Sequence, residues 1–135
     1  MSSNNDEQHW TYRARPATNL HFPRGVVSAD TLDVEIDLGF EIYHRVRVKL
    51  ANVVTADEHG DSPGERAEAE RQRDYVIAWI AEAGGRGPAW PLEIETDRDN
   101  YQDSQYLANV RRRSDGVDLE TALCEEYRSV EEVAQ

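Results

Sequence analysis

The clearest pattern in this sequence is a pair of neighbouring segments in which apolar and charged residues alternate. In residues 32–38 the apolar side chains alternate with three acids, and in residues 44–50 they alternate with three basic residues. Gly39-Phe40 lies between the two segments. A period of two is typical of strands with one buried face, and glycine favours the turn that joins such strands. Residues 32–50 are therefore predicted to form a β-hairpin.

Three further segments have the pattern of strands. Trp10, Tyr12 and Ala14 alternate with polar residues until Pro16, and a similar alternation recurs in residues 92–97 and 106–110. Val26-Val27 adds a short apolar run after a loop. Because proline cannot donate to a strand ladder, Pro16 is expected to end its strand or to hold it at a sheet edge.

Two segments have helical spacing. Residues 65–83 end at Gly84-Gly85, and Gly is a common helix stop signal. The apolar stripe of this helix is predicted to contain Ala67, Tyr75, Ala78 and Trp79, with Arg71 and Ile80 beside it. The second helix is predicted from the spacing of Leu119, Leu123, Tyr127 and Val130.

The order of these elements predicts a mainly β fold with added helices (α+β). It fits a five-stranded OB-type Greek-key barrel with one long helix after the third strand and a C-terminal helix. Residues 1–9 are predicted to be a polar arm, residues 10–128 to form the OB-fold domain, and residues 129–135 to extend the last helix.

The charge of the chain limits its partners. There are 27 acidic and 15 basic residues, so the net charge is −12, and Lys49 is the only lysine. Such a composition is typical of proteins in concentrated salt, where screening lengths fall to about 3 Å; a GC-rich genome is the alternative explanation. Since nucleic-acid binding requires a basic surface, nucleic acid is an unfavoured partner. The only dense basic run is Arg111, Arg112 and Arg113.

No segment approaches the roughly 18 consecutive apolar residues that a membrane helix requires, so no membrane partner is expected. The N-terminal residues lack the profile of a signal peptide, and Cys124, the single cysteine, cannot form an internal disulfide. We therefore expect the protein in the cytoplasm or in a virus particle, and not secreted through a signal peptide.

Several segments together resemble the staphylococcal-nuclease-like (thermonuclease) family. They are VVSADTLDVEIDLGF with RVRVKLANV, then GERAEAERQRDYVIAWI, then YLANV and DGVDL, and the resemblance covers about residues 10–128. It implies an OB-fold barrel and, in active family members, calcium-dependent cleavage of phosphodiester bonds in DNA and RNA.

The family's catalytic positions are only partly retained. Asp30 matches a calcium-ligating aspartate, and Thr55 matches a Thr of the second motif. Lys49 stands where the family has an Arg, which keeps the charge but loses the bidentate fork. Val54 replaces a metal-binding aspartate, and this loss leaves an apolar group where calcium prefers oxygen.

Two more positions complete the family's cleft. The general-base glutamate corresponds to Asp57, or to Glu58 after a one-residue slip. Gln105 replaces the Arg that would stabilise the pentacovalent phosphate, and an Arg in such a role commonly contributes about 10³-fold or more in rate. No catalytic set is therefore intact, and neither a metal nor another cofactor is expected.

Two functions remain open. The first is a non-catalytic module for protein binding or self-assembly, for example a structural component of a virus of a halophilic host. The alternative is a calcium-dependent nuclease that cleaves DNA or RNA with a displaced metal site. Asp30 and Asp57 are the weak metal candidates for that site, with Glu58 and Asp61 as further acids.

Two groups are candidates for an interface. Residues 1–15, with Trp10 and Tyr12, are expected to contact a protein partner and to lie outside the core, because Trp and Tyr commonly anchor interfaces. Arg111, Arg112 and Arg113 form either a solvated strand end or a contact surface. The basic residues of the hairpin are expected to face acids across the strands, in the pairs Asp37–Arg45, Glu35–Arg47 and Asp33–Lys49.

Overall fold

The computed structural model describes residues 9–17, 22–51, 53, 55–56, 59–85, 89–102 and 105–127. In this part of the chain the fold is mixed α+β, as predicted, with one six-stranded sheet, two α-helices and the short 3-10 helix η1 (Pro23–Gly25). The strands and helices are β1 (His9–Pro16), β2 (Val26–Ser28), β3 (Thr31–Asp37), β4 (Tyr43–Leu50), α2 (Pro63–Gly85), β5 (Leu92–Gln102), β6 (Gln105–Arg112) and α3 (Leu119–Glu126). The predicted arm before residue 9 and the predicted helix extension over 129–135 lie outside the described residues.

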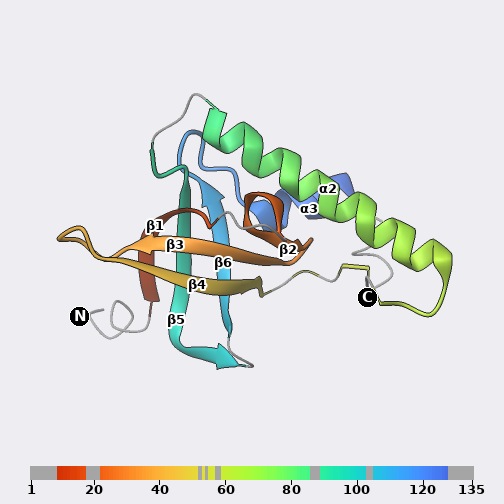
Figure 1. Cartoon of the computed structure of the whole chain (residues 1–135), viewed down its shortest axis with the longest axis horizontal. Helices are drawn as coiled ribbons and strands as arrows, with labels where there is room; N and C mark the ends of the chain where they lie inside the picture. Colours follow the sequence, from red (N-terminus) through yellow and green to blue (C-terminus); the bar gives the residue numbers. More distant parts are fainter. Residues whose placement is uncertain are drawn as a thin grey trace.

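The strands follow the order β1-β5-β6-β4-β3-β2, and β1 also pairs with β3 (Figure 1). Strand β1 pairs with β3 as well as with β5. The strands therefore form a ring of pairings, in the order β1, β5, β6, β4 and β3. All of these pairs are antiparallel except β4–β6, which is parallel. The ring brings residues from both ends of the sequence around one core.

Strand β1 corrects the expectation that residues 1–15 lie outside the core. Its residues pair with β5 from His9↔Asp97 to Ala14↔Leu92, and with β3 from Ala14↔Ile36 to Pro16↔Val34. Ala14 is completely buried. The alternation of Trp10, Tyr12 and Ala14 therefore reflects a strand of the sheet. Of the predicted segment 1–15, residues 1–8 lie outside the described residues.

The hairpin forms as predicted, but its register differs from the predicted one. Asp33 faces Arg47, and Glu35 faces Arg45, so each acid lies opposite a residue two positions earlier than expected. The reason is the turn, in which the backbone N–H of Leu38 donates to the carbonyl of Ile42 at 2.9 Å. This bond closes the hairpin around the three residues 39–41.

The corrected register changes the ion pairs. Arg47 makes two hydrogen bonds to the buried carboxylate of Asp33, at 2.7 and 3.1 Å. The hydrogen bond to Asp33 raises the pKa of Arg47. Glu35 pairs with Arg15 of β1 at 2.8 Å. The acids of β3 therefore bind basic residues on both neighbouring strands, and a simple two-strand ladder is the wrong description.

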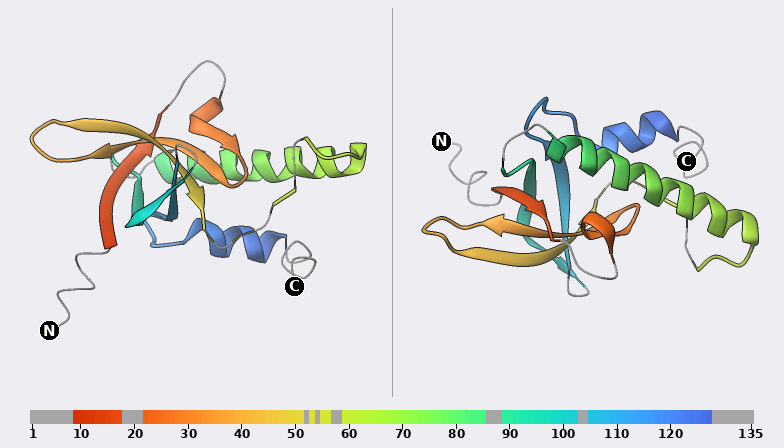
Figure 2. Two further views of the ribbon diagram at one scale, coloured as in Figure 1. Left: turned by 90° about the horizontal axis from the view of Figure 1, so that it is seen from below. Right: turned by 45° about the horizontal axis from the view of Figure 1, so that its top comes forward.

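Helix α2 lies across one side of the sheet, with α3 beside it (Figure 2). Its length agrees with the prediction, but its buried face is different. Ala67 and Ala78 are exposed, whereas the buried residues recur at three-to-four spacing: Ala69, Gln72, Val76, Trp79, Ile80 and Ala83. Gln72 can face the core because its Oε1 accepts a hydrogen bond from the backbone N–H of Ala56 at 2.8 Å.

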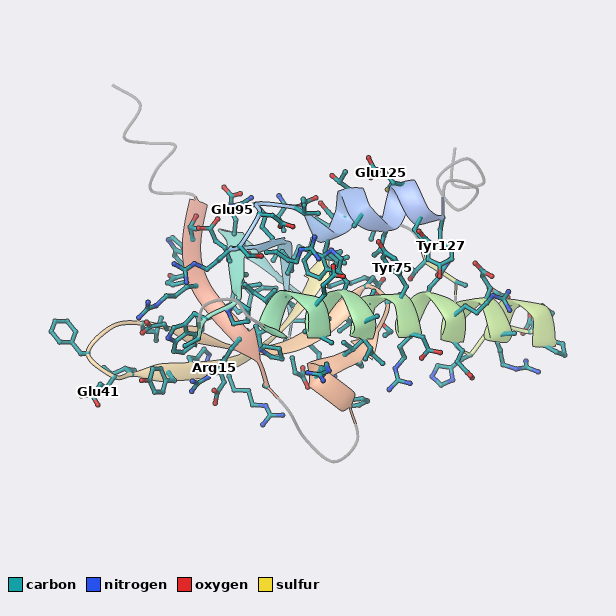
Figure 3. All side chains as sticks on the ribbon, turned by 90° about the horizontal axis from the view of Figure 1, so that it is seen from above. Arg15, Glu41, Tyr75, Glu95, Glu125 and Tyr127 are labelled. Atoms are coloured by element: carbon teal, nitrogen blue, oxygen red, sulfur yellow. The ribbon has the colours of Figure 1, made fainter. Side chains whose placement is uncertain are left out.

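Helix α3 begins at Asp118, whose side chain caps the helix by accepting a bond from the N–H of Thr121. Beyond its last turn, the ring of Tyr127 packs edge-to-face on Tyr75 of α2, with centroids 5.8 Å apart (Figure 3). Burial raises the pKa of Tyr75, and the charge of Glu126 raises it further. The predicted helical position Val130 lies outside the described residues. Across the described residues, neither helix is both long and apolar enough to cross a bilayer.

The predicted core tryptophans Trp79 and Trp90 are both buried. Trp90 precedes β5 and packs against the outer side of the β1–β3 seam. The guanidinium groups of Arg13 and Arg15 lie 5.4 and 4.4 Å from its ring centroid, and the ring of Tyr43 lies 5.4 Å away. Since these groups come from β1 and β4, Trp90 helps to hold the ring of strands together.

Candidate functional site

A hollow of about 180 Å³ lies on the inner side of the strand ring. Every strand of the ring contributes to it, because side chains of the same parity along each strand point inward. Its lining residues are Trp10 and Tyr12 from β1, Ile36 and Leu38 from β3 and the turn, His44, Val46 and Val48 from β4, Ile94 and Thr96 from β5, and Tyr106 from β6.

The hollow has the chemistry of an apolar binding site. None of the described residues that line it carries a carboxylate, ammonium or guanidinium group. Trp10, which is 37% exposed, and the half-exposed Leu38 leave apolar surface open to solvent at its rim. His44, Thr96 and the tyrosine hydroxyls add a few polar groups. Concave sites of this kind bind apolar groups, with orientation set by a small number of polar atoms.

The hairpin tip, residues 38–43, carries further exposed apolar side chains beside the hollow. Phe40 is 97% exposed, and Ile42 and Tyr43 are about half exposed. Gly39, Phe40 and Glu41 all have positive φ angles, of 88°, 56° and 61°. The last two lack the freedom of glycine, so their conformation is unfavourable, and strained exposed residues concentrate at functional sites. Figure 3 shows labelled Glu41 at the tip, far from Glu125 and Tyr127 on the helical side.

Of the predicted cleft residues, Asp30 and Lys49 lie close together. Thr31, beside Asp30, is the Cα partner of Lys49, and the backbone N–H of Leu50 donates to the carbonyl of Asp30 at 2.8 Å. The carboxylate of Asp30 accepts hydrogen bonds from Ser28 and Thr31, both at 2.9 Å. These bonds hold the carboxylate within its own turn.

Gln105 begins β6, and the next residue, Tyr106, is the Cα partner of Val48. It therefore lies two positions from Lys49 along the parallel ladder. Thr55 is half-buried, whereas Val54, Asp57 and Glu58 lie outside the described residues. Within the described part of the chain, no three His, Cys, Asp or Glu side chains are placed to share one metal ion.

The basic run Arg111 to Arg113 at the end of β6 has its partners within the protein. Arg111 pairs with Glu93 at 2.7 Å and with Glu95 at 3.3 Å, and its hydrogen bond to Glu93 raises its pKa. Arg112 pairs with Glu82 of α2 and with Asp115, and lies over the ring of Trp79. Arg113 donates to the carbonyl of Trp90 at 2.9 Å. Each guanidinium group of this run, predicted as a solvated strand end or a contact surface, therefore has at least one partner within the protein.

No protein-family model matches this sequence, and a search of curated proteins finds no significant match. The resemblance to the thermonuclease family therefore stays a prediction from the sequence segments given above.

Trp10 and Tyr12, which the sequence indicates as interface residues, both line the hollow. The hairpin tip was not predicted as part of a site, although an apolar residue directly after a turn glycine, Phe40 after Gly39, is a signal that points to it. The hollow was not predicted either, because its walls come from strands far apart in the sequence.

Proposed function

We propose that this protein is a non-catalytic, OB-type member of the thermonuclease-like family that acts in protein binding or assembly. In this proposal the hollow receives an apolar side chain of a protein partner. The single observation that carries it is an aromatic hollow, whose described lining residues carry no charge, beside the exposed apolar hairpin tip. Exposed apolar patches of this kind commonly mark interaction sites.

The strand pairings support the OB-type description. If β1 and β2 are two parts of one bent strand, the ring contains five strands, with the long helix α2 inserted between the third and fourth. The first strand then pairs with both the second and the fourth, and the third runs parallel to the fifth. This connectivity agrees with a five-stranded Greek-key barrel.

The cleft residues support the absence of catalysis. Phosphoryl-transfer enzymes place positive charge on the developing oxyanion, and Gln105 cannot supply it. Arg47, the nearby cation on β4, is held by the buried Asp33 through two hydrogen bonds. Nucleic-acid binding is also disfavoured, because Arg13, Arg15, Arg111 and Arg112 form internal ion pairs in a chain of net charge −12.

Binding of a small phenylalanine analogue tests the proposed site. The protein is kept at about 20 µM in 0.1 M KCl, well below the expected dissociation constant. N-acetyl-phenylalaninamide is expected to bind with a dissociation constant of roughly 1 mM, given about 0.3 kcal/mol per heavy atom. The measurement is the NMR shift of the Trp10 indole N–H, assigned with Trp10→Phe. N-acetyl-glycinamide, which lacks the ring, is the ligand control.

Two variants localise the binding. Val46→Phe fills the hollow and should weaken binding at least about tenfold, which is roughly 1.4 kcal/mol. Ala67→Glu adds a charge to an exposed position of α2 and should leave binding unchanged. Equal binding by Val46→Phe and the wild type would place the ligand elsewhere and would contradict the proposal.

The nuclease alternative gives the opposite expectation in a cleavage assay. With calcium and single-stranded DNA, the purified protein is expected to show no digestion above a buffer control, because Val54 and Gln105 replace an acid and an Arg. Gel electrophoresis after overnight incubation is the measurement. Calcium-dependent digestion that disappears in Asp30→Ala would instead establish a nuclease with a displaced metal site.

A further inference from the structure

We propose that the partner is a second copy of this chain, with Phe40 of each copy seated in the hollow of the other. This inference rests on the proposed function, since it assigns an occupant to the same hollow. The observation that carries it is a matched pair of features on one chain: an aromatic side chain that is 97% exposed, and an apolar hollow bordered by the same hairpin.

The sizes of the two features agree. An apolar protein cavity of about 150 Å³ is known to bind one benzene molecule. The hollow, with a volume of about 180 Å³, can therefore receive one phenyl ring. Trp10, Tyr12 and Tyr106 line it, and aromatic rings pack favourably at offset or edge-to-face geometries.

The position of Phe40 in the hairpin tip brings no burial of its ring within its own chain. The ring is exposed, and both Phe40 and Glu41 have left-handed backbone conformations. Asn or Gly would adopt this conformation more readily than Phe, and would expose less apolar surface. A partner that buries the ring explains why an aromatic residue occupies the turn.

The distribution of charge favours contact through this end of the molecule. Strands β1, β3, β4, β5 and β6 together with Glu41 carry eight basic and eight acidic residues, so they are neutral overall. Helices α2 and α3 carry three basic and eight acidic residues. The hairpin tip projects away from the first turns of α2 and from α3 (Figure 2). Two copies that meet through their hairpins therefore keep the acidic helices apart.

The arrangement fits a two-fold symmetric contact. In such a contact the same patch is used on both copies, so it must contain a projecting group and a complementary recess. Leu38 and His44 line the hollow and belong to the same hairpin as Phe40. Phe40 and the hollow therefore lie within one patch. Each dimer would then contain two equivalent Phe40 contacts.

Sedimentation equilibrium of the full chain in 0.1 M and 2 M KCl tests this proposal. The wild type is expected to dimerise with a dissociation constant below about 1 mM, and at least as tightly in 2 M KCl, because salt screens the remaining repulsion between the acidic copies. Phe40→Asn removes the ring and suits the left-handed backbone, so it should fold normally and associate at least about tenfold more weakly. Glu41→Asn is the matched control, since it alters the same turn, keeps the ring and should dimerise like the wild type.

Val46→Phe supplies a second test, because it keeps Phe40 but fills the hollow, and it should also be monomeric. Thermal melting of each variant verifies folding, and the Phe40→Asn and Glu41→Asn comparison suffices if Val46→Phe does not fold.

A wild type that stays monomeric at 1 mM in both salts, or a Phe40→Asn protein that dimerises equally, would overturn the proposal. Phe40-dependent binding to phosphatidylcholine and phosphatidylserine vesicles without dimerisation would also overturn it, with lipid as the occupant. If N-acetyl-phenylalaninamide still binds a monomeric wild type, self-association is wrong and the proposed function stands.

Discussion

Trp90→Ala is expected to lower the free energy of unfolding by about 3–5 kcal/mol, the usual cost of truncating a buried large aromatic residue. Trp90 is 8% exposed and contacts Arg13 and Arg15 of β1 and Tyr43 of β4. Its loss leaves a cavity at the seam where β1 joins the ring, and also removes two cation–π contacts. Urea denaturation followed by far-UV circular dichroism measures the change.

Trp10→Ala is the matched control for this prediction. Trp10 is 37% exposed at the rim of the hollow, so its truncation should cost no more than about 1–2 kcal/mol. The same variant should weaken the binding of N-acetyl-phenylalaninamide, followed through the methyl resonances of Val46 and Ile94 because the indole is absent. If both tryptophan variants lose similar stability, the assignment of Trp90 to the structural seam and Trp10 to the binding site is wrong.

Raising the salt concentration from 0.1 M to 2 M KCl is expected to raise the melting temperature by about 5 °C or more, which corresponds to roughly 1 kcal/mol. The acids exceed the basic residues by twelve in the whole chain, and salt screens their repulsion. Differential scanning calorimetry in the two salts gives the difference directly.

Glu70→Lys supplies the control for the salt prediction. Glu70 is exposed on α2, where acids outnumber basic residues, so reversing its charge should reduce the gain from salt without removing a core contact. A melting temperature that is unchanged or lower in 2 M KCl would contradict adaptation to salt, and would favour a GC-rich genome as the reason for the arginine-rich composition.

The elements were predictable because each depends on local pattern. The alternation in residues 32–38 and 44–50 corresponds to β3 and β4, and the segment 65–83 falls inside α2. Gly39 begins the predicted turn. These features follow from the period of the side chains and from backbone preferences, and both can be read within a short window of sequence.

The packing was less predictable because it depends on partners outside that window. The buried stripe of α2 includes Gln72, whose amide is satisfied by the backbone of Ala56, and a hydrophobicity pattern cannot anticipate such a bond. The register of the hairpin depended on a three-residue turn with two left-handed non-glycine residues, Phe40 and Glu41. A tertiary contact therefore decided the position of Gln72, whereas the backbone conformation of the turn decided the register.

The site was predictable only in part. Trp10 and Tyr12 were chosen as binding residues for their type, but they were assigned to an arm, whereas pairing with β5 places them in the wall of the hollow. Arg111 to Arg113 were chosen for their charge, and their acidic partners Glu82 and Glu93 come from α2 and β5. The three-dimensional arrangement thus places Trp10 and Tyr12 at the hollow and gives the three arginines partners within the protein.

The claim that the hollow binds an apolar side chain is tested most directly by intermolecular nuclear Overhauser effects in a methyl-labelled sample with N-acetyl-phenylalaninamide. The proposed function predicts contacts between the ring protons of the ligand and the methyl groups of Val46 and Ile94, which line the hollow from opposite sides of the β4–β6–β5 ladder. Contacts to methyl groups on α2 or α3 in place of these, or no contacts at a ligand concentration that shifts the Trp10 indole resonance, would contradict the claim.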